Sequence, residues 1–334
     1  MKICLIGEYS GKPDEGMKNI TFYLTRELSR RNEVLNLNPK AAFSAGFWRK
    51  ARDFRPQIIH YIPGPSLQSF ILVKALALNY GRAKVAMSAF HPALSSFSKR
   101  FIPRLKPDIV FIQSHRTEKM FSNLDCRTAF LPSGVDIDRF SPVSSEAKGK
   151  LREQYGIDQK RFIALHVGHL NKGRNLQVLE QLQGNGNQVI IVGSTSTRVD
   201  RGVYRQLEQK GCLVWRNYLD NIEEVYALAD CYIFPTLEAL NAVELPISVM
   251  EAMACNLPVV TTRFGALDRI FSEGDGLFFV EKETEFADRL EQLKAGAIEV
   301  KTREKVLPYS WKSVATRAEE IYSDLYSAGD KGES

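Results

Sequence analysis

The segment 169–174 carries the residue types best suited to holding a phosphate group. It follows an apolar run at 162–167 that predicts a strand, and it contains Lys172, Gly173 and Arg174. A lysine and an arginine in a glycine-containing turn between a strand and a helix can bind a diphosphate and stabilise the charge that develops when the diphosphate departs. The simpler alternative is a solvated basic loop that binds nothing.

The segment 235–262 offers a second place for an anion or a sugar. A strand ends at Pro235, an irregular loop follows, a helix begins near Ile247, and the next strand starts at Pro258. The first turn of a helix presents free backbone N–H groups and positive dipole character to a ligand. Glu251 lies about one turn into this helix, where its carboxylate can accept hydrogen bonds from ribose hydroxyls. Alternatively, the helix is an ordinary crossover and Glu251 is solvated.

Short apolar runs alternate with longer segments of helical period along the whole chain, which is typical of parallel sheets built from βαβ units. The sequence therefore predicts an α/β protein. Strands are expected at 2–6, 33–36, 57–61, 84–88, 109–113 and 128–131, and again at 162–167, 188–192, 213–215, 231–234, 258–261 and 277–279. Two such series fit two Rossmann-like domains better than one long sheet.

A polar stretch at 141–150, rich in small and turn-forming residues, is expected to join the two domains. The first domain is predicted to span 1–143 and the second 144–308. Ligands of open α/β sheets bind beyond the carboxyl ends of the strands, so the cleft between two such domains is the expected site.

The net charge of +6 divides unevenly along the sequence. Residues 1–150 hold 24 Lys and Arg against 12 Asp and Glu, a net charge of +12, whereas residues 151–334 hold 21 against 27, a net charge of −6. The basic first half is expected to face an anionic partner or surface.

The composition, with 44% hydrophobic and 25% charged residues, excludes disordered, collagen-like and disulfide-scaffold proteins. The five cysteines are scattered and odd in number, and they show neither CxxC nor metal-ligand spacing. They are expected to be reduced thiols in a reducing compartment, which favours a cytoplasmic protein.

Three further motifs extend over most of the chain. Residues 131–142 are LPSGVDIDRFSP, residues 251–260 are EAMACNLPVV, and residues 309–311 are YSW. In this order, and with the basic loop between the first and second, they resemble the motifs of the family-4 retaining glycosyltransferases of GT-B fold. The resemblance implies two Rossmann-like domains that face each other across a cleft, a C-terminal helix at 309–328 that crosses back to the first domain, and a polar tail at 329–334.

The resemblance also implies an activity, the transfer of a sugar from a nucleotide-diphosphate donor to an acceptor hydroxyl with retention of anomeric configuration. The second domain is expected to bind the donor, and the first to bind an acceptor that is a sugar or a lipid-linked molecule. Such a reaction would serve glycolipid, glycan or cell-surface polysaccharide synthesis. A donor phosphate oxygen is expected to take the acceptor proton, so no metal ion or other cofactor is needed, and Asp136 and Asp138 are expected to belong to the junction motif rather than to a metal site.

Matching the family motifs residue by residue gives the candidate site. Lys172 matches the lysine of the family's diphosphate-binding loop, and His169 and Arg174 stand in the same loop, which is two residues shorter here. Gly16 matches the second glycine of a Gly-Gly loop that approaches phosphate and acceptor. His91 follows a predicted strand where the family commonly places a histidine near the anomeric carbon; alternatively, His91 is a structural loop residue.

The chain departs from the family at the first of two paired glutamates, which usually contacts the transferred sugar. Counting back eight positions from Glu251 gives Val243. Glu244 is the favoured replacement, and Glu238 is the alternative. The predicted catalytic residues are therefore His91, Lys172 and Glu244, and the further donor contacts expected in this segment are Leu245, Ile247 and Glu251.

Two stretches of the basic half, 43–55 and 97–106, mix aromatic residues with cations. Such stretches suit the surface of an anionic membrane, and family members that act on lipid-linked acceptors often dock through a basic first domain. The alternative is that the aromatic residues belong to the core. No nucleic-acid partner is expected, because no helix-turn-helix, RRM or zinc module accompanies the charge. The expected location is the cytoplasm, including the cytoplasmic face of the membrane.

Two other classes of function share these features. A nucleotide-sugar epimerase or a phosphorylase of the same fold would release altered sugar without an acceptor or would require phosphate or pyridoxal phosphate. The second of these classes is a non-catalytic protein that binds a nucleotide sugar, and Val243 is the best argument for it. No oligomeric state is predicted.

Overall fold

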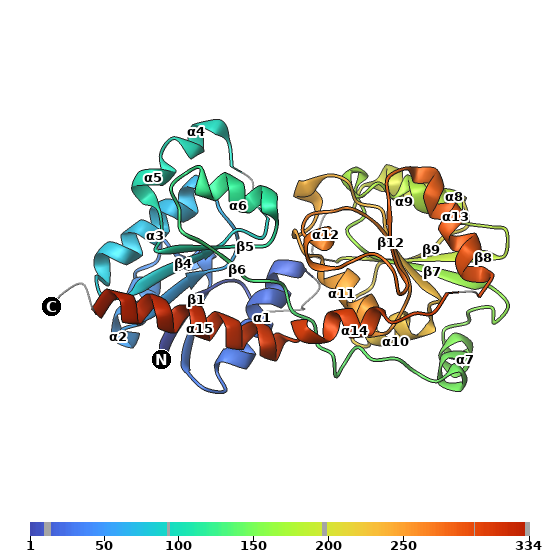
Figure 1. Ribbon diagram of the computed structural model, residues 1–334, viewed down its shortest axis with the longest axis horizontal. Helices are drawn as coiled ribbons and strands as arrows, with labels where there is room; N and C mark the ends of the chain where they lie inside the picture. The colour runs from blue at the N-terminus through green and yellow to red at the C-terminus, as the bar shows by residue number, and fades with distance from the viewer. Residues whose placement is uncertain (10–14, 92–93, 196–198, 297, 331–334) are drawn as a thin grey trace. The chain divides into compact units, whose positions relative to one another are not determined.

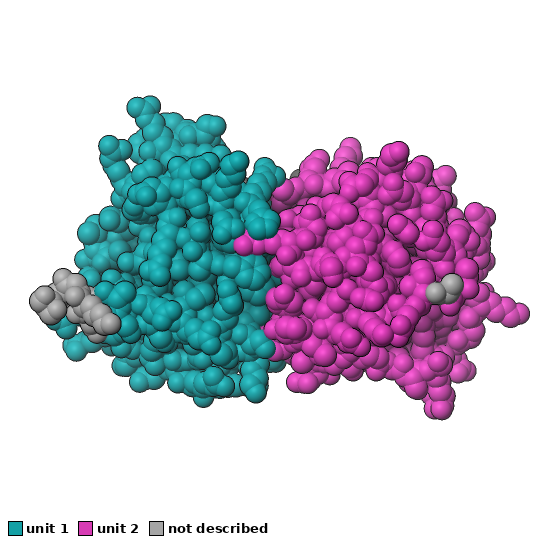
Figure 2. Space-filling model, in the orientation of Figure 1, with its two compact units in different colours: residues 1–134, 243–245, 311–334 teal, residues 135–242, 246–310 magenta. Residues whose placement is uncertain are grey.

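The computed structural model describes residues 1–9, 15–91, 94–195, 199–296 and 298–330. These residues form two compact units, which are coloured separately in Figure 2. Unit 1 comprises Met1–Gly134, Val243–Leu245 and the chain from Trp311 on, and unit 2 comprises Val135–Ala242 and Pro246–Ser310. Of the polar tail predicted at 329–334, residues 331–334 lie outside the described part of the chain.

Unit 1 is built on a parallel sheet with the strand order β2-β1-β3-β4-β5-β6. Ile3 of the inner strand β1 pairs with Val34 of the edge strand β2 on one side and with Ile58 of β3 on the other. Ile3 and Ile58 are fully buried, as expected for a parallel sheet that is covered on both faces. The strands are β1 Lys2–Ile6, β2 Glu33–Leu37, β3 Ile58–Tyr61, β4 Lys84–Ser88, β5 Ile109–Ile112 and β6 Thr128–Phe130.

The helices of unit 1 connect its strands and cover the sheet (Figure 1). Side chains alternate between the two faces along a strand, so Val85 and Met87 of β4 pack in one apolar cluster with Phe70 of α3 and Phe121 of α6. The helices are α1 Gly16–Leu28, α2 Ala45–Phe54, α3 Leu67–Asn79, α4 Ser96–Lys99, α5 Ile102–Leu105 and α6 His115–Ser122, with a 3-10 turn, η1, at Pro39–Ala41.

The last helix, α15 at Trp311–Asp330, belongs to unit 1, as expected for a C-terminal helix that returns to the first domain. The indole of Trp311 stacks on the ring of Tyr23 in α1, with ring centroids 5.0 Å apart, and it also lies directly against Gly134. Further along α15, the hydroxyl of Tyr322 is 2.6 Å from Nδ1 of the buried His60 in β3. The helix therefore completes the core of unit 1.

Unit 2 contains a second parallel sheet, with the strand order β12-β11-β10-β7-β8-β9. The order reverses at β7, because β8 follows it on one side while β10 pairs with it on the other. The strands are β7 Phe162–Gly168, β8 Asn187–Gly193, β9 Leu213–Trp215, β10 Cys231–Phe234, β11 Val259–Thr262 and β12 Leu277–Val280.

The helices of unit 2 alternate with these strands. Ile191 of β8 and Ile233 of β10 pack in one apolar cluster with Leu179 of α8, Leu207 of α9 and Phe286 of α13. The helices are α7 Ser145–Gln154, α8 Gln177–Leu182, α9 Arg201–Gln209, α10 Ile222–Leu228, α11 Ile247–Ala254, α12 Leu267–Ile270, α13 Glu283–Lys294 and α14 Thr302–Val306, with 3-10 turns η2 Lys172–Arg174, η3 Ala239–Asn241 and η4 Leu307–Tyr309.

The predicted α/β class is confirmed by the two parallel sheets with alternating helices. Each strand expected from the sequence is present, and its ends differ from the expected ones by no more than one residue. The agreement follows from burial, since strands covered on both faces are continuous apolar runs that the sequence displays directly. Within the described ranges, no helix combines the length and the hydropathy needed to span a bilayer.

Candidate functional site

The candidate site of unit 2 lies at the carboxyl end of β7, where the strand order reverses. Ligands of open parallel sheets bind outside the carboxyl ends of the strands at such a reversal. The loop that leaves β7 contains His169 and leads into η2, which consists of Lys172, Gly173 and Arg174. The basic residues predicted to hold a diphosphate therefore stand together at this end of the sheet.

Arg174 is a buried cation with no ion pair in the part of the chain that the structure describes. Its residue is only 6% exposed, its guanidinium carbon lies 5.7 Å from the ring centroid of Phe234, and its Nε has no hydrogen-bond partner among the described residues. Burial lowers the pKa of Arg174 to about 10, because the charged form loses its hydration. Such a charge is costly unless an anion neutralises it.

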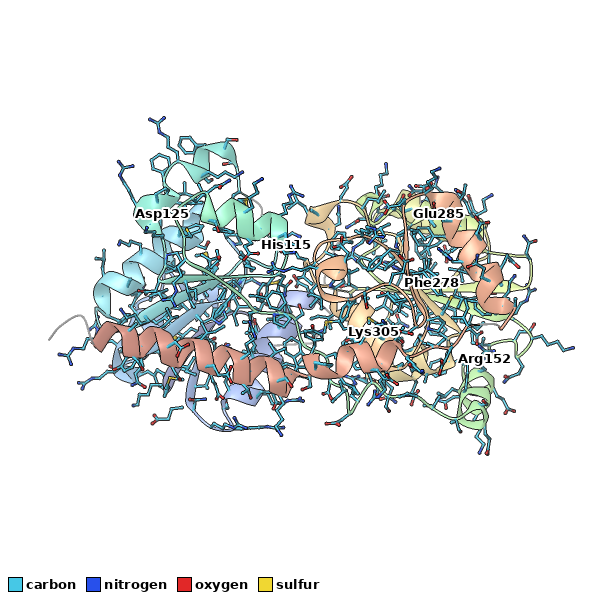
Figure 3. The ribbon with its side chains drawn as sticks, viewed as in Figure 1. His115, Asp125, Arg152, Phe278, Glu285 and Lys305 are labelled. Atoms are coloured by element: carbon cyan, nitrogen blue, oxygen red, sulfur yellow. The ribbon has the colours of Figure 1, made fainter. Side chains whose placement is uncertain are left out.

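Arg152, labelled in Figure 3, is an equally buried arginine of the same unit, and it has both an ion pair and hydrogen bonds. It too is 6% exposed, but one terminal nitrogen lies 2.6 Å from a carboxylate oxygen of Asp230 and its Nε donates to the carbonyl oxygen of Leu228 at 2.9 Å. Buried charges are normally paired and hydrogen-bonded in this way. Among the described residues, Arg174 has neither an ion pair nor a hydrogen bond of this kind.

Four other buried polar atoms near the carboxyl ends of β7 and β10 have no hydrogen-bond partner in the described structure. They are Nε2 of His166, Oδ1 of Asn171, Nδ2 of Asn175 and Oγ1 of Thr236. More than nine in ten buried polar groups in folded proteins are hydrogen-bonded, so such a group of atoms marks a place where a ligand or water binds. Donors and acceptors are both present, which suits a ligand with hydroxyls as well as phosphate oxygens.

The imidazole of His166 is held in one tautomer. Its Nδ1 lies 2.9 Å from the carbonyl oxygen of Ile233, so Nδ1 carries the proton and donates it, and Nε2 offers a lone pair. Burial, aided by the nearby Arg174, lowers the pKa of His166 to about 3. A Cβ on Gly168 would lie 2.9 Å from a terminal nitrogen of Arg174 and 3.1 Å from Nε2 of His166, so glycine leaves room for both side chains.

The η2 turn lies against the loop between β10 and α11. A Cβ on Gly173 would collide with the side-chain amide of Asn241, so only glycine fits there without a shift. Asn241 in turn donates from Nδ2 to the carboxylate of Glu238 at 2.8 Å. Lys172 itself is exposed, and His169 is half-buried. The packing fixes the backbone of the turn and leaves the ammonium of Lys172 in solvent.

Helix α11 begins at Ile247 after Pro246, and no side chain caps its first amides. Glu251 lies one turn further on, where the hydroxyl of the fully buried Tyr226 donates to Oε2 at 2.7 Å. Burial raises the pKa of Glu251 to about 7, even though the hydrogen bond from Tyr226 opposes the rise. The helix therefore has no side-chain cap at its start and carries a carboxylate one turn later; binding of a donor by either group stays a prediction.

Gly16 and His91, the candidates from the first half, lie in unit 1. Gly16 opens α1, and a Cβ built on it would meet only the side chain of Val243, at an ordinary contact distance of 3.4 Å. Packing therefore does not require a glycine there. His91 follows β4 and is half-buried, and its carbonyl oxygen lies near Gly64. Roles for both residues toward donor and acceptor stay predictions.

Glu244 and Leu245 also fall in unit 1, because the segment Val243–Leu245 is part of it. The carboxylate of Glu244 accepts hydrogen bonds from Ser114 and Thr117, and the residue is only 4% exposed. A contact of Glu244 with the transferred sugar stays a prediction. The other predicted donor contacts, His169, Lys172, Arg174, Ile247 and Glu251, all lie in unit 2.

The Asp-Ile-Asp motif at 136–138 makes structural contacts. Oδ1 of Asp136 accepts from the backbone N–H of Arg139 at 3.2 Å, and the Arg139 guanidinium donates to Glu223 at 2.8 Å. Arg303 donates to the carbonyl oxygen of Ile137 at 3.0 Å. Nowhere in the described ranges do three or more His, Cys, Asp or Glu side chains form a group that could hold a metal ion.

Sequence reasoning missed His166, Asn171 and Thr236. Their position in the sequence was the available signal: His166 is a polar residue inside β7, and Asn171 and Thr236 follow the ends of β7 and β10 by three and two residues. A polar side chain in that place is either satisfied by the protein or reserved for a ligand, and only the hydrogen-bond partners decide which.

Residues 162–295 match the family described as Glycosyl transferases group 1. This match covers most of unit 2, which is thus similar to the domains of that family. Each of the two units is Rossmann-like, with a six-stranded parallel sheet and alternating helices.

The chain is also similar in sequence to known glycosyltransferases. The D-inositol 3-phosphate glycosyltransferase of Corynebacterium jeikeium is 29% identical over 232 residues, which cover 62% of this chain and 54% of that protein. The putative teichuronic acid biosynthesis glycosyltransferase TuaC of Bacillus subtilis is 25% identical over 260 residues, which cover 75% of this chain and 57% of TuaC. The chain thus spans little more than half the length of these relatives.

Two solved structures show the same fold. HepE from Anabaena in complex with UDP is similar with a TM-score of 0.76 at 16% identity, over 97% of this chain and 100% of that one. The sucrose-phosphate synthase of Thermosynechococcus elongatus is similar with a TM-score of 0.81, also at 16% identity, over 98% of this chain and 100% of the other.

Proposed function

We propose that this protein is a glycosyltransferase that moves a sugar from a nucleotide-diphosphate donor to the hydroxyl of an acceptor, with retention of anomeric configuration. The observation that carries the proposal is the buried guanidinium of Arg174 at the carboxyl end of β7, without an ion pair among the described residues and inside a domain similar to those of the glycosyl transferases group 1 family. A diphosphate is the anion that such a domain would place there. The UDP bound to HepE supports a nucleotide donor.

The diphosphate, the sugar and the ribose of the donor substrate are each assigned binding residues in unit 2. Arg174 and Lys172 neutralise the diphosphate, and His169 lies in the same loop. The free amides at the start of α11, from Ile247 on, donate to phosphate or sugar oxygens. Glu251 accepts from the ribose hydroxyls, and Tyr226 holds its carboxylate in place.

The reaction breaks the bond between the anomeric carbon and the diphosphate oxygen and forms a bond from that carbon to the acceptor oxygen on the same face of the sugar. The acceptor proton passes to the oxygen of the departing diphosphate. Lys172 and Arg174 stabilise the negative charge that grows on the diphosphate. Gly16 is assigned to the donor, where a residue without a Cβ allows close approach to phosphate, and His91 is assigned a catalytic role near the anomeric carbon; no metal ion or other cofactor is invoked.

The first test is a donor screen followed by one substitution. Thermal shift with UDP-, GDP-, ADP- and dTDP-sugars identifies the base, because a ligand at 100 times its Kd stabilises the folded protein by about 2.7 kcal/mol. With that donor, Lys172→Ala is expected to lower kcat about 10²–10³-fold, since it removes one preorganised charge from the departing diphosphate. Turnover close to that of the wild type would overturn the assignment of Lys172.

A second function, nucleotide-sugar binding without catalysis, is favoured by one observation. Val243 stands where the family has its sugar-binding glutamate, and Glu244 beside it is engaged by Ser114 and Thr117. Tight nucleotide binding with no product across a broad panel of donors and acceptors would support this function. Release of altered sugar without an acceptor would instead indicate an epimerase.

We further propose that unit 1 docks on an anionic membrane through its helices α4 and α5. Phe97 and Phe101 are 68% and 39% exposed and pack edge to face with each other, 5.2 Å between centroids. Arg100 and Arg104 beside them are exposed and form no ion pair in the described structure. Exposed aromatic rings among unpaired cations suit the interface of a bilayer.

The first aromatic stretch supports docking less well. Phe47 of α2 is 2% exposed and belongs to the core of unit 1, as the alternative reading expected, whereas Phe43 before the helix is fully exposed. A lipid-linked acceptor would be reached from the cytoplasmic face of the membrane.

Vesicle flotation tests the docking. Binding is expected to vesicles that contain anionic lipid, to weaken at high salt, and to fall with Arg100→Gln plus Arg104→Gln. The matched control, Arg201→Gln plus Arg205→Gln, removes the same charge from α9 of unit 2 and is expected to leave flotation unchanged. Equal loss in both pairs, or no binding at any salt concentration, would overturn the membrane proposal.

A further inference from the structure

Three consecutive residues, Val243–Leu245, belong to unit 1, although the residues on either side of them belong to unit 2. They directly precede Pro246, after which α11 begins. Glu244, at their centre, is 4% exposed. A carboxylate that is buried so completely needs partners, and those partners show what the side chain does.

The carboxylate of Glu244 sits at the start of α6. Oε1 accepts from the hydroxyl of Ser114 at 2.7 Å and from the hydroxyl of Thr117, and Oε2 accepts from the backbone N–H of Ser114 at 3.1 Å. Ser114 is the N-cap of α6, so the carboxylate also meets the positive end of that helix. Both carboxylate oxygens are therefore occupied by protein donors.

The backbone around Glu244 is fixed as well. The N–H of Glu244 donates to the carbonyl oxygen of Phe90 at 2.8 Å, and the N–H of Leu245 donates to the side-chain oxygen of Gln113 at 3.0 Å. Val243 lies beside Gly16, within ordinary contact of a Cβ built there. Glu244 and Leu245 thus both have specific backbone hydrogen-bond partners within unit 1.

Burial raises the pKa of Glu244, whereas the hydrogen bonds from Thr117 and Ser114 lower it. The exposed Arg116, two residues from Ser114, also favours the charged form. These donors make the buried carboxylate tolerable, and they take three of its roughly four acceptor positions.

We propose that Glu244 is a positioning residue that anchors Val243–Leu245 to Ser114 and Thr117, and not a ligand of the transferred sugar. The expected effect on turnover rests on the proposed function, whereas the hydrogen-bonded anchor itself does not. The anchor fixes the residues that lead into α11, whose first amides are assigned to the donor. A displacement of about 1 Å in such a segment can lower turnover about 100-fold without loss of any group that touches the substrate.

The anchor and a sugar ligand make different predictions for Thr117. Thr117→Val removes the hydroxyl but keeps the shape of the side chain, and Thr117 is fully buried, so it does not meet solvent. If Glu244 is an anchor, Thr117→Val and Glu244→Ala both lower kcat at least about tenfold and change the Kd for the nucleotide to the same small extent, because Lys172, Arg174 and Glu251 remain intact.

The experiment uses the full chain with four variants: Glu244→Ala, Thr117→Val, the double variant, and the control Thr25→Val. Thr25 also lies in unit 1 and donates its hydroxyl to the carbonyl oxygen of Thr21 at 2.7 Å, with no link to Glu244. Thr117→Val is expected to lower the Tm of the wild type but not the Tm of Glu244→Ala, since the hydroxyl has already lost its acceptor there. Thr25→Val is expected to lower the Tm equally in both backgrounds.

Three results would overturn the anchor. One is an equal loss of Tm from Thr117→Val in both backgrounds. Another is a change in donor KM or sugar preference in Glu244→Ala that Thr117→Val does not share, which would make Glu244 a sugar ligand. The third is wild-type turnover in both single variants.

Failure of the proposed function is separable from failure of the anchor. If no donor is turned over by the wild type, the comparison of Tm values still decides whether Glu244 and Thr117 act together. If Glu244→Ala does not fold, Glu244→Gln takes its place, because it keeps the volume and one acceptor oxygen and is expected to reduce the effect of Thr117→Val rather than remove it.

Discussion

Arg174 and Arg152 are equally buried arginines of unit 2, and replacing each with methionine is expected to change stability in opposite directions. The pKa of Arg174, lowered from 12.5 to about 10, corresponds to about 3 kcal/mol by which folding disfavours its charge. Methionine keeps the length and apolar stem of the side chain and removes that cost. Allowing for the lost contact with Phe234, Arg174→Met is expected to stabilise the nucleotide-free protein by about 1–3 kcal/mol.

Arg152→Met removes a cation that has partners. Asp230 keeps its ion pair with Lys148 at 2.6 Å, but the carbonyl oxygen of Leu228 loses its donor. Breaking a buried pair typically costs 3–5 kcal/mol, and the remaining pair with Lys148 puts the expected loss near the lower limit, about 3 kcal/mol.

Thermal denaturation of the nucleotide-free chain measures both changes. Each kcal/mol shifts Tm by about 2–4 °C in a domain of this size, so the two variants should move several degrees apart in opposite directions. Calorimetric titration with UDP, or with the nucleotide found in the donor screen, measures the nucleotide affinity of each variant. Arg174→Met is expected to weaken binding about 100-fold or more, and Arg152→Met is expected to leave it unchanged.

A fall in Tm for Arg174→Met comparable to that for Arg152→Met would refute the reasoning, because it would mean that the protein itself satisfies Arg174. Unchanged nucleotide affinity in Arg174→Met would refute the assignment of its anion. A rise in Tm together with lost affinity is the signature of a group whose burial is unfavourable until the ligand arrives.

Two further predictions concern stability. Burial lowers the pKa values of His60 and His166 to about 3. Between about pH 6.5 and pH 3 the unfolded chain therefore binds protons that the folded chain does not bind. The free energy of unfolding should thus decrease as the pH is lowered through this range, by up to about 1.4 kcal/mol per pH unit for each histidine. In urea denaturation, His60→Phe should lose less stability than the wild type between pH 7 and pH 5, and parallel losses would contradict this. Gly134→Ala should cost about 1–3 kcal/mol, because the new Cβ would lie 2.5 Å from the indole of Trp311, whereas Gly81→Ala meets nothing within 4 Å and should be nearly neutral. Equal Tm values for the two alanine variants would argue against the close packing of α15.

The strands of both sheets could be predicted from the sequence because each is a short apolar run between polar turns. The same logic placed Lys172 and Arg174 in a turn after a strand, and Ile247 at the start of a helix. These are local properties, set by the period of the side chains and by the residues that begin and end each element.

The partners of each polar side chain could not be predicted in this way. Arg174 and Arg152 look alike in the sequence, yet among the described residues Arg152 is paired with Asp230, whereas Arg174 has the ring of Phe234 beside it and no ion pair. The difference arises because such partners come from distant parts of the chain. Glu244 was favoured as a sugar ligand from its place beside Val243, and its bonds to Ser114 and Thr117, about 130 residues away, became visible only in the fold.

The sequence by itself determined the α/β class, the order of the strands along the chain, and a basic turn that suits a diphosphate. The tertiary structure decided which of those charges is buried without a partner and which carboxylate is already bound. The physical reason is that periodicity and turn residues act over a few positions, whereas the desolvation of a charge depends on every group that folding brings around it.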